Sequence, residues 1–342
     1  MEGLGMSGAW DGRSVFVTGA YGLLGSWLVK ALLNEGARVT VLKRDATPAA
    51  ALELEGTEAR VNVVHGDCTV ADTIQRALAD YEVDTVFHLA AQTIVGAAYR
   101  SPVSTFRVNV GGTWTVLEAC RTHGIPRVVV ASSDKAYGEH VELPYREDFA
   151  LQPRFPYDVS KAAADLIARS YWQTYGVPVA VTRCANLYGG GDLNTSRLIP
   201  EVVSAAIAGR APVIRSDGSP GRDFLYVEDA VAAYLALAEA LDGKGAAGEA
   251  FNAGGGRPHS VRELVELICR VAGTEVEPQF RGDGTPPGEI DRQWVDATKL
   301  RELTGWEPTV DLEEGLARTI AWYREFPAAL VPAGAAAGPP SA

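Results

Sequence analysis

Short apolar runs alternate with longer amphipathic segments through the first half of the chain. The apolar runs predict strands at residues 14–18, 38–42, 61–64, 85–89, 127–131 and 179–182. The segments between them predict helices at residues 26–34, 73–80 and 104–123, and a further helix that begins near Tyr157. Strands without polar alternation are buried on both faces. Their alternation with helices predicts an α/β fold built on a doubly wound parallel sheet.

A glycine-rich turn joins the first predicted strand to the first predicted helix. Gly19, Gly22 and Gly25 follow Thr18 directly, although their spacing differs from the usual G-x-G-x-x-G pattern. Glycines let a backbone turn tightly and approach a pyrophosphate, and a helix N-terminus attracts its negative charge. The strand–turn–helix context therefore favours a dinucleotide site of the Rossmann type over a plain tight turn.

After Arg183, polar and glycine-rich segments separate the remaining predicted helices at residues 198–208, 227–240, 258–273 and 311–324, with a loop at 215–222. We predict a dinucleotide-binding domain of residues 12–187 and 224–254. A smaller, interleaved C-terminal domain of residues 188–223 and 255–326 should bind the substrate. It would cap the carboxyl ends of the strands, where open parallel sheets bind ligands. Residues 1–11 and 327–342 are predicted to be loose tails.

Tyr157 and Lys161 are four residues apart, which places a phenol and an ammonium on one face of a helix. A cation there would stabilise the phenolate and lower the tyrosine pKa, making Tyr157 a base near neutral pH. Ser133, Asp134 and Lys135 follow the strand at 127–131, beside the predicted cofactor. The serine hydroxyl there can orient the proton that Tyr157 removes. These motifs together predict a redox site, which the Tyr–Lys spacing alone does not.

The second strand ends in Leu42-Lys43-Arg44-Asp45, where an acidic residue would normally bind the adenosine ribose of NAD. No acid stands at position 43, and the two cations could neutralise the 2′-phosphate of NADP. Asp45 could reach the ribose instead. The cofactor is therefore predicted to be NAD(P), with NADP narrowly favoured.

Composition excludes several other classes of protein. The chain has 342 residues and a formal net charge of −12, which argues against a nucleic-acid surface. No apolar run is long enough to cross a membrane, and no metal-type cysteine pair occurs among Cys68, Cys120, Cys184 and Cys269. We therefore expect no metal site, and a protein of the reducing cytoplasm.

Several strings in order resemble the extended short-chain dehydrogenase/reductase superfamily, specifically its nucleotide-sugar epimerases and dehydratases. Besides the motifs above, they are His88-Leu89-Ala90-Ala91-Gln92, Asn109-Val110-x-Gly112-Thr113, Arg183-Cys184-Ala185-Asn186-Leu187-Tyr188-Gly189 and Arg222-Asp223-Phe224-x-Tyr226-Val227-x-Asp229. Details that look like CDP-glucose 4,6-dehydratases are Gly25-Ser26-Trp27-Leu28, Ser133-Asp134-Lys135, and Gly189-Gly190-Gly191-Asp192 followed by Arg197-Leu198-Ile199-Pro200. Lys43-Arg44 and the form of the segment from Arg222 to Tyr226 depart from those dehydratases.

The resemblance implies a role for each matching position. Catalysis would fall to Ser133, Asp134, Lys135, Tyr157 and Lys161. The cofactor would contact Gly19, Tyr21, Gly22, Leu23, Leu24, Gly25, Lys43, Arg44, Asp67, Leu89, Ala90, Ala91, Tyr157 and Lys161. A nucleotide-diphosphate hexose would contact Gln92, Asn186, Arg197 and Arg222. Guanidinium groups suit phosphate oxygens, so the two arginines also fit an anionic substrate on chemical grounds, although Arg222 could instead pair with Asp223 or Asp229.

Two reactions fit these residues, and both begin when Tyr157 takes the proton of the sugar 4-hydroxyl. In a 4,6-dehydratase, two further groups would remove the C5 proton and help the 6-hydroxyl leave, which suits Asp134 and Lys135 without assigning either role. In a C4 epimerase, hydride would return to the opposite face of C4, and the Asp–Lys pair would be unnecessary. A regulator that has lost catalysis is disfavoured because Ser133, Tyr157 and Lys161 are all present. The resemblance also implies a homodimer, through the helices at 104–123 and 157–175.

Overall fold

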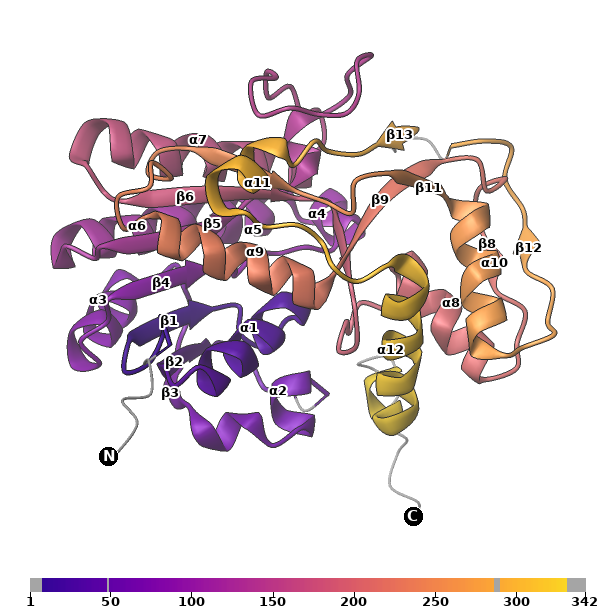
Figure 1. Ribbon diagram of the computed structural model, residues 1–342, viewed down its shortest axis with the longest axis horizontal. Coiled ribbons are helices and arrows are strands. Elements are labelled where there is room, and N and C mark those ends of the chain that lie inside the picture. The colour runs from indigo at the N-terminus through magenta and orange to yellow at the C-terminus, as the bar shows by residue number, and fades with distance from the viewer. Residues whose placement is uncertain (1–7, 48, 286–289, 331–342) are drawn as a thin grey trace, which may run out of the picture.

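The computed structural model describes residues 8–47, 49–285 and 290–330, which form two adjoining parts (Figure 1). The larger part is built on a seven-stranded sheet in the order β10-β6-β5-β4-β1-β2-β3. Every neighbouring pair in this sheet is parallel. Its strands are β1 (Ser14–Thr18), β2 (Arg38–Lys43), β3 (Asn62–His65), β4 (Thr85–His88), β5 (Arg127–Ala131), β6 (Val179–Cys184) and β10 (Ala250–Ala253). The predicted doubly wound α/β fold is confirmed.

Helices cover both faces of this sheet, and each face has its own core. Successive residues of β1 point to opposite sides, so Val15 and Val17 pack in one core while Phe16 packs in the other. The first core includes residues of α1 (Leu23–Asn34) and α9 (Val227–Ala240). The second includes residues of α3 (Ala71–Asp80), α6 (Gly112–His123) and α7 (Pro156–Tyr175). Burial on both faces explains the continuous apolar runs in the sequence.

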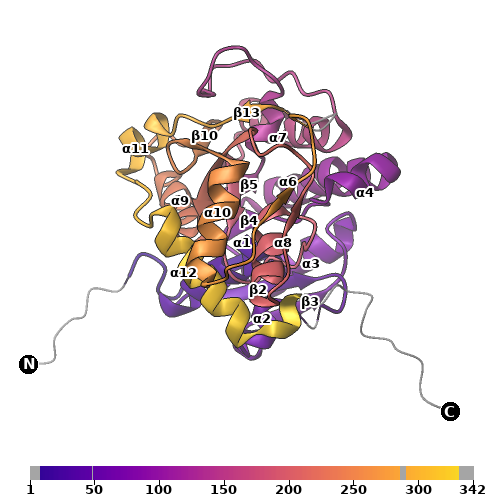
Figure 2. The same ribbon diagram turned by 90° about the vertical axis from the view of Figure 1, so that its right-hand side faces the viewer.

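The smaller part centres on β9 (Gly221–Tyr226), which pairs with β11 (Pro258–Ser260), β13 (Arg292–Gln293) and β7 (Asn186–Tyr188). A separate pair is formed by β8 (Val213–Ile214) and β12 (Gln279–Phe280). The view in Figure 2 places α8 (Leu198–Ile207), α10 (Val261–Ala272) and α12 (Leu312–Glu325) in front of the main sheet. The helix α11 (Thr298–Thr304) packs against α9 and β10 of the larger part.

Three differences from the predicted elements matter for the site. The helix predicted at 104–123 is α5 (Pro102–Phe106), a π-helical turn (Arg107–Gly111) and α6 in succession. Arg222, which we placed in a loop, lies on β9, and the segment predicted to begin a helix at Pro258 begins with β11. Short helical elements without a sequence prediction include α2 (Ala51–Leu54), η1 (Thr57–Arg60), α4 (Val95–Arg100) and η3 (Asp134–Tyr137). The loose tail predicted from residue 327 was wrong at η4 (Pro327–Leu330), a helical turn in which Ala329 is buried.

The N-terminal segment is not loose throughout. Trp10 is buried, packs in a tilted arrangement against Phe87, and donates its indole N–H to Glu239 at 2.9 Å. The prediction of a loose tail was therefore wrong at Trp10, because the aromatic ring finds a place in the core. Residues 1–7 and 331–342 of the two predicted tails lie outside the described residues.

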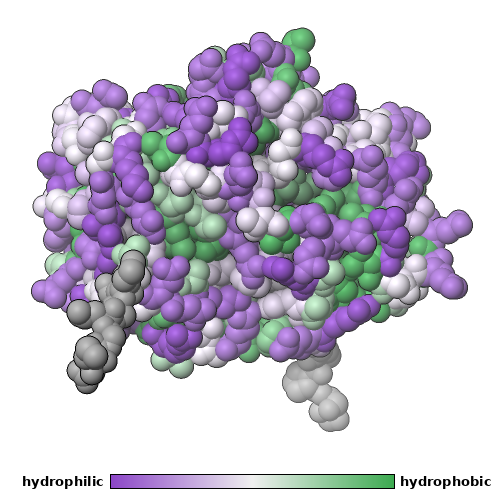
Figure 3. Space-filling view, viewed as in Figure 1, coloured by the Kyte–Doolittle hydropathy of each residue, from purple (hydrophilic) through white to green (hydrophobic). Residues whose placement is uncertain are grey.

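The surface agrees with the acidic, polar composition. Hydrophilic residues cover most of the face in Figure 3, and apolar residues emerge in patches between them. No helix among the described residues is both long and apolar enough to span a bilayer. Within the same residues, no cluster of three or more His, Cys, Asp or Glu side chains could hold a metal ion.

Candidate active site

The predicted site residues gather at one edge of the main sheet. The glycine turn follows β1, Leu89 to Gln92 follow β4, and Ser133 follows β5. Because these strands are parallel neighbours, their carboxyl ends meet at the same edge, which is where open α/β sheets bind ligands. Tyr157 and Lys161 reach this edge from the first turns of α7.

The β1–α1 turn lies in close contact with the loop after β4. Gly19 has a positive φ of 75°, and a Cβ placed there would come within 2.7 Å of the Ala90 backbone nitrogen. A Cβ on Gly25 would collide with the carbonyl oxygen of Gly19. Ala90 also donates its N–H to Thr18 Oγ1 at 3.2 Å. Both glycines are therefore required for the turn and the loop to approach one another.

The start of α1 has the properties of an anion site. The helix begins at Leu23 after Gly22, and no side chain caps its first N–H groups. Leu24 follows in the same first turn, whose N–H groups carry the positive end of the helix dipole. A cofactor pyrophosphate would fit here, because its oxygens could accept hydrogen bonds from the N–H groups that no side chain caps.

At the end of β2, the surroundings of Lys43 differ from what we predicted for a cation that binds a 2′-phosphate. The Lys43 ammonium is held by Glu53 and Glu58, each at 2.7 Å, and the Tyr21 hydroxyl donates to Glu58 at 2.8 Å. The prediction that Lys43 and Arg44 would jointly neutralise a 2′-phosphate is therefore not supported for Lys43, because two carboxylates already neutralise it.

Arg44 is more exposed than Lys43 and is paired with Asp45 at 2.6 Å. It lines a hollow of about 320 Å³ together with Ala91 and Gln92. Asp67 is near enough to help raise the pKa of Arg44, after the larger effect of the Asp45 hydrogen bond, and its Oδ1 accepts from Thr69 at 2.9 Å. The structure thus brings the predicted cofactor-binding residues Arg44, Asp67 and Ala91 into one region.

Lys161 is anchored to the end of β5. Its ammonium donates to the carbonyl oxygen of Ala131 at 2.8 Å, and the Ser132 hydroxyl donates to the Lys161 carbonyl at 3.1 Å. Burial lowers the pKa of the Lys161 ammonium to about 8. The two bonds fix α7 against β5, which places the first turn of α7 beside Ser133.

Tyr157 is buried, and its environment opposes ionisation in the protein alone. Burial raises the pKa of its phenol to about 12, while the Arg197 cation and a hydrogen bond with Ser133 act in the opposite direction. We expected the Lys161 ammonium to bring the Tyr157 pKa down toward neutral pH, and the residues around the phenol do not do so. The reason is that desolvation of the phenolate outweighs the nearby positive charge.

Asp134 and Lys135 begin η3, directly after Ser133. The Ser133 hydroxyl donates to Asp134 Oδ1 at 3.1 Å and accepts from the Lys135 backbone N–H at 3.3 Å. Asp134 is only 2% exposed, and burial raises the pKa of its carboxyl. Burial also raises the pKa of Asp158 to about 6, and Lys135 is near enough to oppose that shift. This arrangement places two carboxyls and an ammonium around the predicted Ser/Tyr pair.

The predicted substrate residues come from four separate segments. Gln92 is fixed through Asn109, which accepts its backbone N–H at 2.7 Å. Asn186 donates from β7 to the Asp223 carbonyl on β9 at 3.1 Å. Arg197 precedes α8 and pairs with Asp192 at 3.1 Å.

Arg222 donates to the carbonyl oxygens of Gly221 and Asp291 at 3.0 and 2.9 Å, and its charge reaches Asp134. The carboxylates of Asp223 and Asp229, its other proposed partners, accept backbone N–H groups from Gly255 and Thr309. Arg197, just before α8, therefore lies near Tyr157, and Arg222, on β9, lies near Asp134.

Sequence reasoning missed the residues that hold these groups in place. His88 is buried between the hydroxyls of Thr18 and Thr113, at 2.8 and 3.2 Å. Burial lowers the pKa of its ring to about 3, so it supports the β4 loop as a neutral ring. Asn109 also donates to Ser160 Oγ at 2.8 Å, which ties the π-helical turn to α7. His88 and Asn109 both belong to motifs that we identified in the sequence, but the spacing of those motifs does not indicate these contacts.

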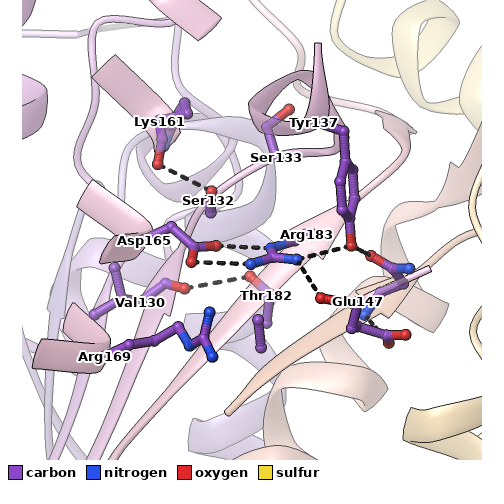
Figure 4. A network of polar contacts seen from close by, with 12 residues as sticks. Val130, Ser132, Ser133, Tyr137, Glu147, Lys161, Asp165, Arg169, Thr182 and Arg183 are labelled. Carbon is purple, nitrogen blue, oxygen red and sulfur yellow. Dashed lines mark hydrogen bonds and ion pairs between the residues drawn. The ribbon is translucent and has the colours of Figure 1, made fainter. Parts of the chain in front are cut away.

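A buried ion pair fastens α7 to β6 (Figure 4). Arg183 donates to Asp165 through Nε at 2.8 Å and through Nη2 at 3.0 Å. Its third nitrogen donates to the Tyr137 hydroxyl at 2.9 Å and to the Glu147 carbonyl at 3.2 Å. The pair lies one helical turn beyond Lys161, so it sets the position of the helix that carries Tyr157.

A parallel sheet with this glycine turn, and with serine, tyrosine and lysine meeting beside it, defines an extended short-chain dehydrogenase/reductase. The family model described as GDP-mannose 4,6 dehydratase matches residues 16–319, and the chain belongs to this family of nucleotide-sugar dehydratases and epimerases. A dTDP-glucose 4,6-dehydratase from Streptomyces griseus is 34% identical over 94% of this chain and 98% of its own. A UDP-glucose 4-epimerase from Mycolicibacterium smegmatis is 35% identical over 90% of this chain and 97% of its own.

Solved structures show the same division between two reactions. The dTDP-glucose 4,6-dehydratase DesIV from Streptomyces venezuelae, in a double mutant solved with NAD bound, matches with a TM-score of 0.82 and 32% identity, covering 91% of this chain and 97% of its own. The UDP-glucose 4-epimerase from Thermotoga maritima, solved with UDP-glucose, matches with a TM-score of 0.84 and 29% identity, covering 92% and 99%. The resemblance inferred from the sequence motifs is confirmed at the level of the family.

Proposed function

We propose that this protein is a sugar-nucleotide 4,6-dehydratase, which converts a nucleotide-diphosphate hexose to its 4-keto-6-deoxy derivative. The observation that carries the proposal is the buried Asp134 beside Lys135, joined through Ser133 to the Tyr157 site. Oxidation at C4 requires Ser133, Tyr157 and Lys161 alone. Loss of water requires two more groups that exchange protons, and the structure supplies them next to the first three.

The site can begin the reaction at the 4-hydroxyl of the sugar. Ser133 would orient this hydroxyl, and Tyr157 would take its proton as the phenolate. Arg197 supplies positive charge near the phenol, and Lys161, held on Ala131, lies one helical turn beyond Tyr157 on α7. A bound nicotinamide cofactor would supply the hydride acceptor for C4 and, once reduced, the hydride donor for C6. Because the cofactor is regenerated in each cycle, we propose that it is retained between turnovers.

Asp134 and Lys135 would divide the loss of water between them. Burial favours the neutral carboxylic acid of Asp134, which therefore suits the role of acid toward the departing 6-hydroxyl. Lys135 would act as the base that removes the C5 proton, which the adjacent 4-ketone acidifies. The C5–H electron pair then forms the C5–C6 double bond, the C6–O bond breaks, and the oxygen takes the Asp134 proton to leave as water.

The diphosphate of the substrate needs an anchor in a chain whose net charge is −12. We propose Arg197 and Arg222 for this role, with Asn186 beside them, because guanidinium groups match phosphate oxygens. Both arginines come from the smaller part of the molecule, which supports the predicted division between a cofactor domain and a substrate domain. Gln92, on the loop after β4, would contact the sugar from the opposite side.

A C4 epimerase is the second candidate. It is supported by the relatives named UDP-glucose 4-epimerase and by the Arg222 segment, which has the form general to both reactions. The test is to incubate the protein with a panel of nucleotide hexoses and follow the products by NMR. A new methyl signal at C6 means dehydration, whereas an inverted C4 coupling pattern without a methyl signal would overturn the dehydratase proposal.

The cofactor is proposed to be a nicotinamide dinucleotide, as in relatives solved with NAD. The predicted narrow preference for NADP now depends on Arg44, since Lys43 is held by two glutamates. If Arg44 contacts a 2′-phosphate, replacing it with Ala should weaken NADP binding about tenfold, the loss of roughly one charge-assisted bond, and leave NAD binding nearly unchanged. Calorimetric titration with both cofactors measures this. Equal losses for both would remove the preference.

A homodimer is proposed from the apolar side chains that α5, α6 and α7 expose. Val103 is 77% exposed, Trp114 52% and Leu166 55%. Replacing Trp114 and Leu166 together with Arg should convert a dimer to a monomer in light scattering, because charge at the centre of an interface is strongly unfavourable. Val141→Arg, on a loop outside these helices, is the matched control. A monomeric wild-type protein would overturn the proposal.

We also propose a cytoplasmic protein. Cys68, Cys120, Cys184 and Cys269 are all free thiols, and all four are buried. Burial raises the pKa of each thiol above its ordinary value, which makes the thiols unreactive as nucleophiles. Such thiols suit a reducing compartment.

A further inference from the structure

Gln293 stands out as a polar side chain whose hydrogen-bonding capacity is unused. It is fully buried on β13, where its Cα pairs in register with Arg222 of β9. Among the residues that the structure describes, neither its amide nitrogen nor its amide oxygen has a partner at ordinary hydrogen-bond distance and angle. Burying such a group without a partner is unfavourable, because its hydrogen bonds to water are lost and not replaced. An arrangement that leaves both atoms unpaired therefore points to a functional partner.

Asp134 has the complementary deficiency. Its Oδ1 accepts from Ser133, but its Oδ2 is buried and also lacks a partner among the described residues. The two side chains are near one another: burial raises the pKa of the Asp134 carboxyl, and the Lys135 charge, hydrogen-bonding contacts with Ser133 and Gln293, and the Arg222 charge oppose this shift in that order. The unpaired amide and the unpaired carboxyl oxygen thus belong to one place in the active site.

The position of Gln293 is fixed by its neighbours in the chain. The Trp294 carbonyl accepts the Tyr145 N–H at 2.9 Å, and the Val295 N–H donates to Asp223 Oδ2 at 3.4 Å. With the backbone held on both β9 and the segment after η3, rotation of the terminal amide is the smallest change that the side chain can make. An amide has a donor at one end and an acceptor at the other, and rotation exchanges them.

We propose that Gln293 is a positioning residue for Asp134, whose carboxyl it holds in both of its protonation states. Toward the carboxylate, the amide presents its N–H₂ as donor. Toward the carboxylic acid, the rotated amide presents its oxygen as acceptor for the acidic proton. Asp134 could then give its proton to the departing 6-hydroxyl and regain it later without moving.

This proposal rests on the proposed dehydration, because only loss of water calls on Asp134. Other groups also face this carboxyl and help set its titration. Those that are charged or titratable are Lys135 on η3, Tyr145 in the loop after η3, Tyr157 and Asp158 on α7, Cys184 on β6, and Arg222 and Asp223 on β9. Because Gln293 is the one neutral amide named among these influences, its replacement tests an effect distinct from theirs.

The experiment compares Gln293→Met with wild type, since Met keeps the unbranched shape and removes both polar ends. We expect water loss, followed as the C6 methyl signal, to slow about 10–100-fold, the lower part of the range for general acid catalysis. C4 oxidation, followed as the absorbance of the reduced nicotinamide, and KM should change less than about threefold. The alkaline limb of the pH profile should move to higher pH, because an influence that lowers the Asp134 pKa is lost.

Two further variants protect the test against a folding defect. Gln293→Glu keeps the volume and adds a second carboxyl, so the alkaline limb should move higher still, because two adjacent carboxylates resist ionising together. Asp134→Asn should make Gln293→Met nearly neutral if the amide acts only through Asp134. Arg292→Gln, on the exposed face of the same strand, is the matched control and should behave as wild type.

Each outcome decides the proposal. A rise in KM with unchanged turnover and pH profile would make Gln293 a sugar ligand and overturn its role toward Asp134. Equal slowing of C4 oxidation and water loss, or an additive effect with Asp134→Asn, would also overturn it. A wild-type protein that loses water from none of the hexoses would overturn the dehydratase proposal itself, and is thereby distinguished from failure of the Gln293 role alone.

Discussion

Replacement of Tyr157 by Phe should lower turnover at least about 10³-fold, within the range for loss of a general base. The substitution removes only the hydroxyl, so the buried ring and the fold should be retained. Cofactor binding should persist because Lys161 remains on Ala131 and the glycine turn is untouched. Single-turnover absorbance of the reduced nicotinamide measures C4 oxidation directly, and calorimetry measures cofactor binding.

The pH dependence of the same step has a defined sign. Burial raises the pKa of Tyr157 to about 12 in the protein alone, so the phenolate fraction increases as pH rises through neutrality. C4 oxidation in the wild-type protein should therefore speed up with pH, and the residual rate of Tyr157→Phe should lose this dependence. Tyr175→Phe, at the exposed end of α7, is the matched control. Activity of Tyr157→Phe within a few-fold of wild type would remove Tyr157 from its proposed role.

The main sheet was predictable because its signals are local. The strands Ser14–Thr18 and Arg127–Ala131 and the helix Val227–Ala240 have the predicted bounds, since burial on both faces of the sheet leaves uninterrupted apolar runs. The position of Ser133 beside the Tyr157 helix was also predictable, because consecutive parallel strands bring their carboxyl ends together. Family and fold follow from such short-range patterns.

The smaller sheet was not predictable, because its pairings join short segments that are far apart in the sequence. The strand β9 pairs with segments that begin at Asn186, Pro258 and Arg292, and each of these three partners has only two or three residues. Such runs are too short for a periodic signal. Gln293 lies near Asp134 through this long-range pairing, so nothing adjacent to it in the chain indicated a role.

The electrostatics of the site could be predicted least well from the sequence. A four-residue spacing places Lys161 near Tyr157, but it does not show that Lys161 is bonded to Ala131 or how far the phenol is desolvated. Likewise, Lys43 is neutralised by Glu53 and Glu58, which belong to a short segment without a sequence prediction. A sequence shows how many charged residues a chain has, but the effect of each charge depends on its burial and on its partners.

The Arg183–Asp165 pair provides the second large expected effect. The exposed fractions of the two side chains are 1% and 0%, and Arg183 uses three nitrogens in hydrogen bonds. Replacing Arg183 with Met should lower the free energy of unfolding by about 3–5 kcal/mol, because the Asp165 carboxylate is then buried without a partner. Denaturant titration measures the change. The exposed pair of Arg318 with Glu314 is the matched control, and Arg318→Met should cost under about 1 kcal/mol.

A double variant separates the cost of an orphaned charge from the value of the pair. If the loss in Arg183→Met arises from the unpaired carboxylate, adding Asp165→Leu should restore a large part of it, since buried ion pairs contribute little net stability over apolar residues. A double variant as unstable as Arg183→Met would instead show that the bonds from Arg183 to Tyr137 and Glu147 hold α7 and η3 together.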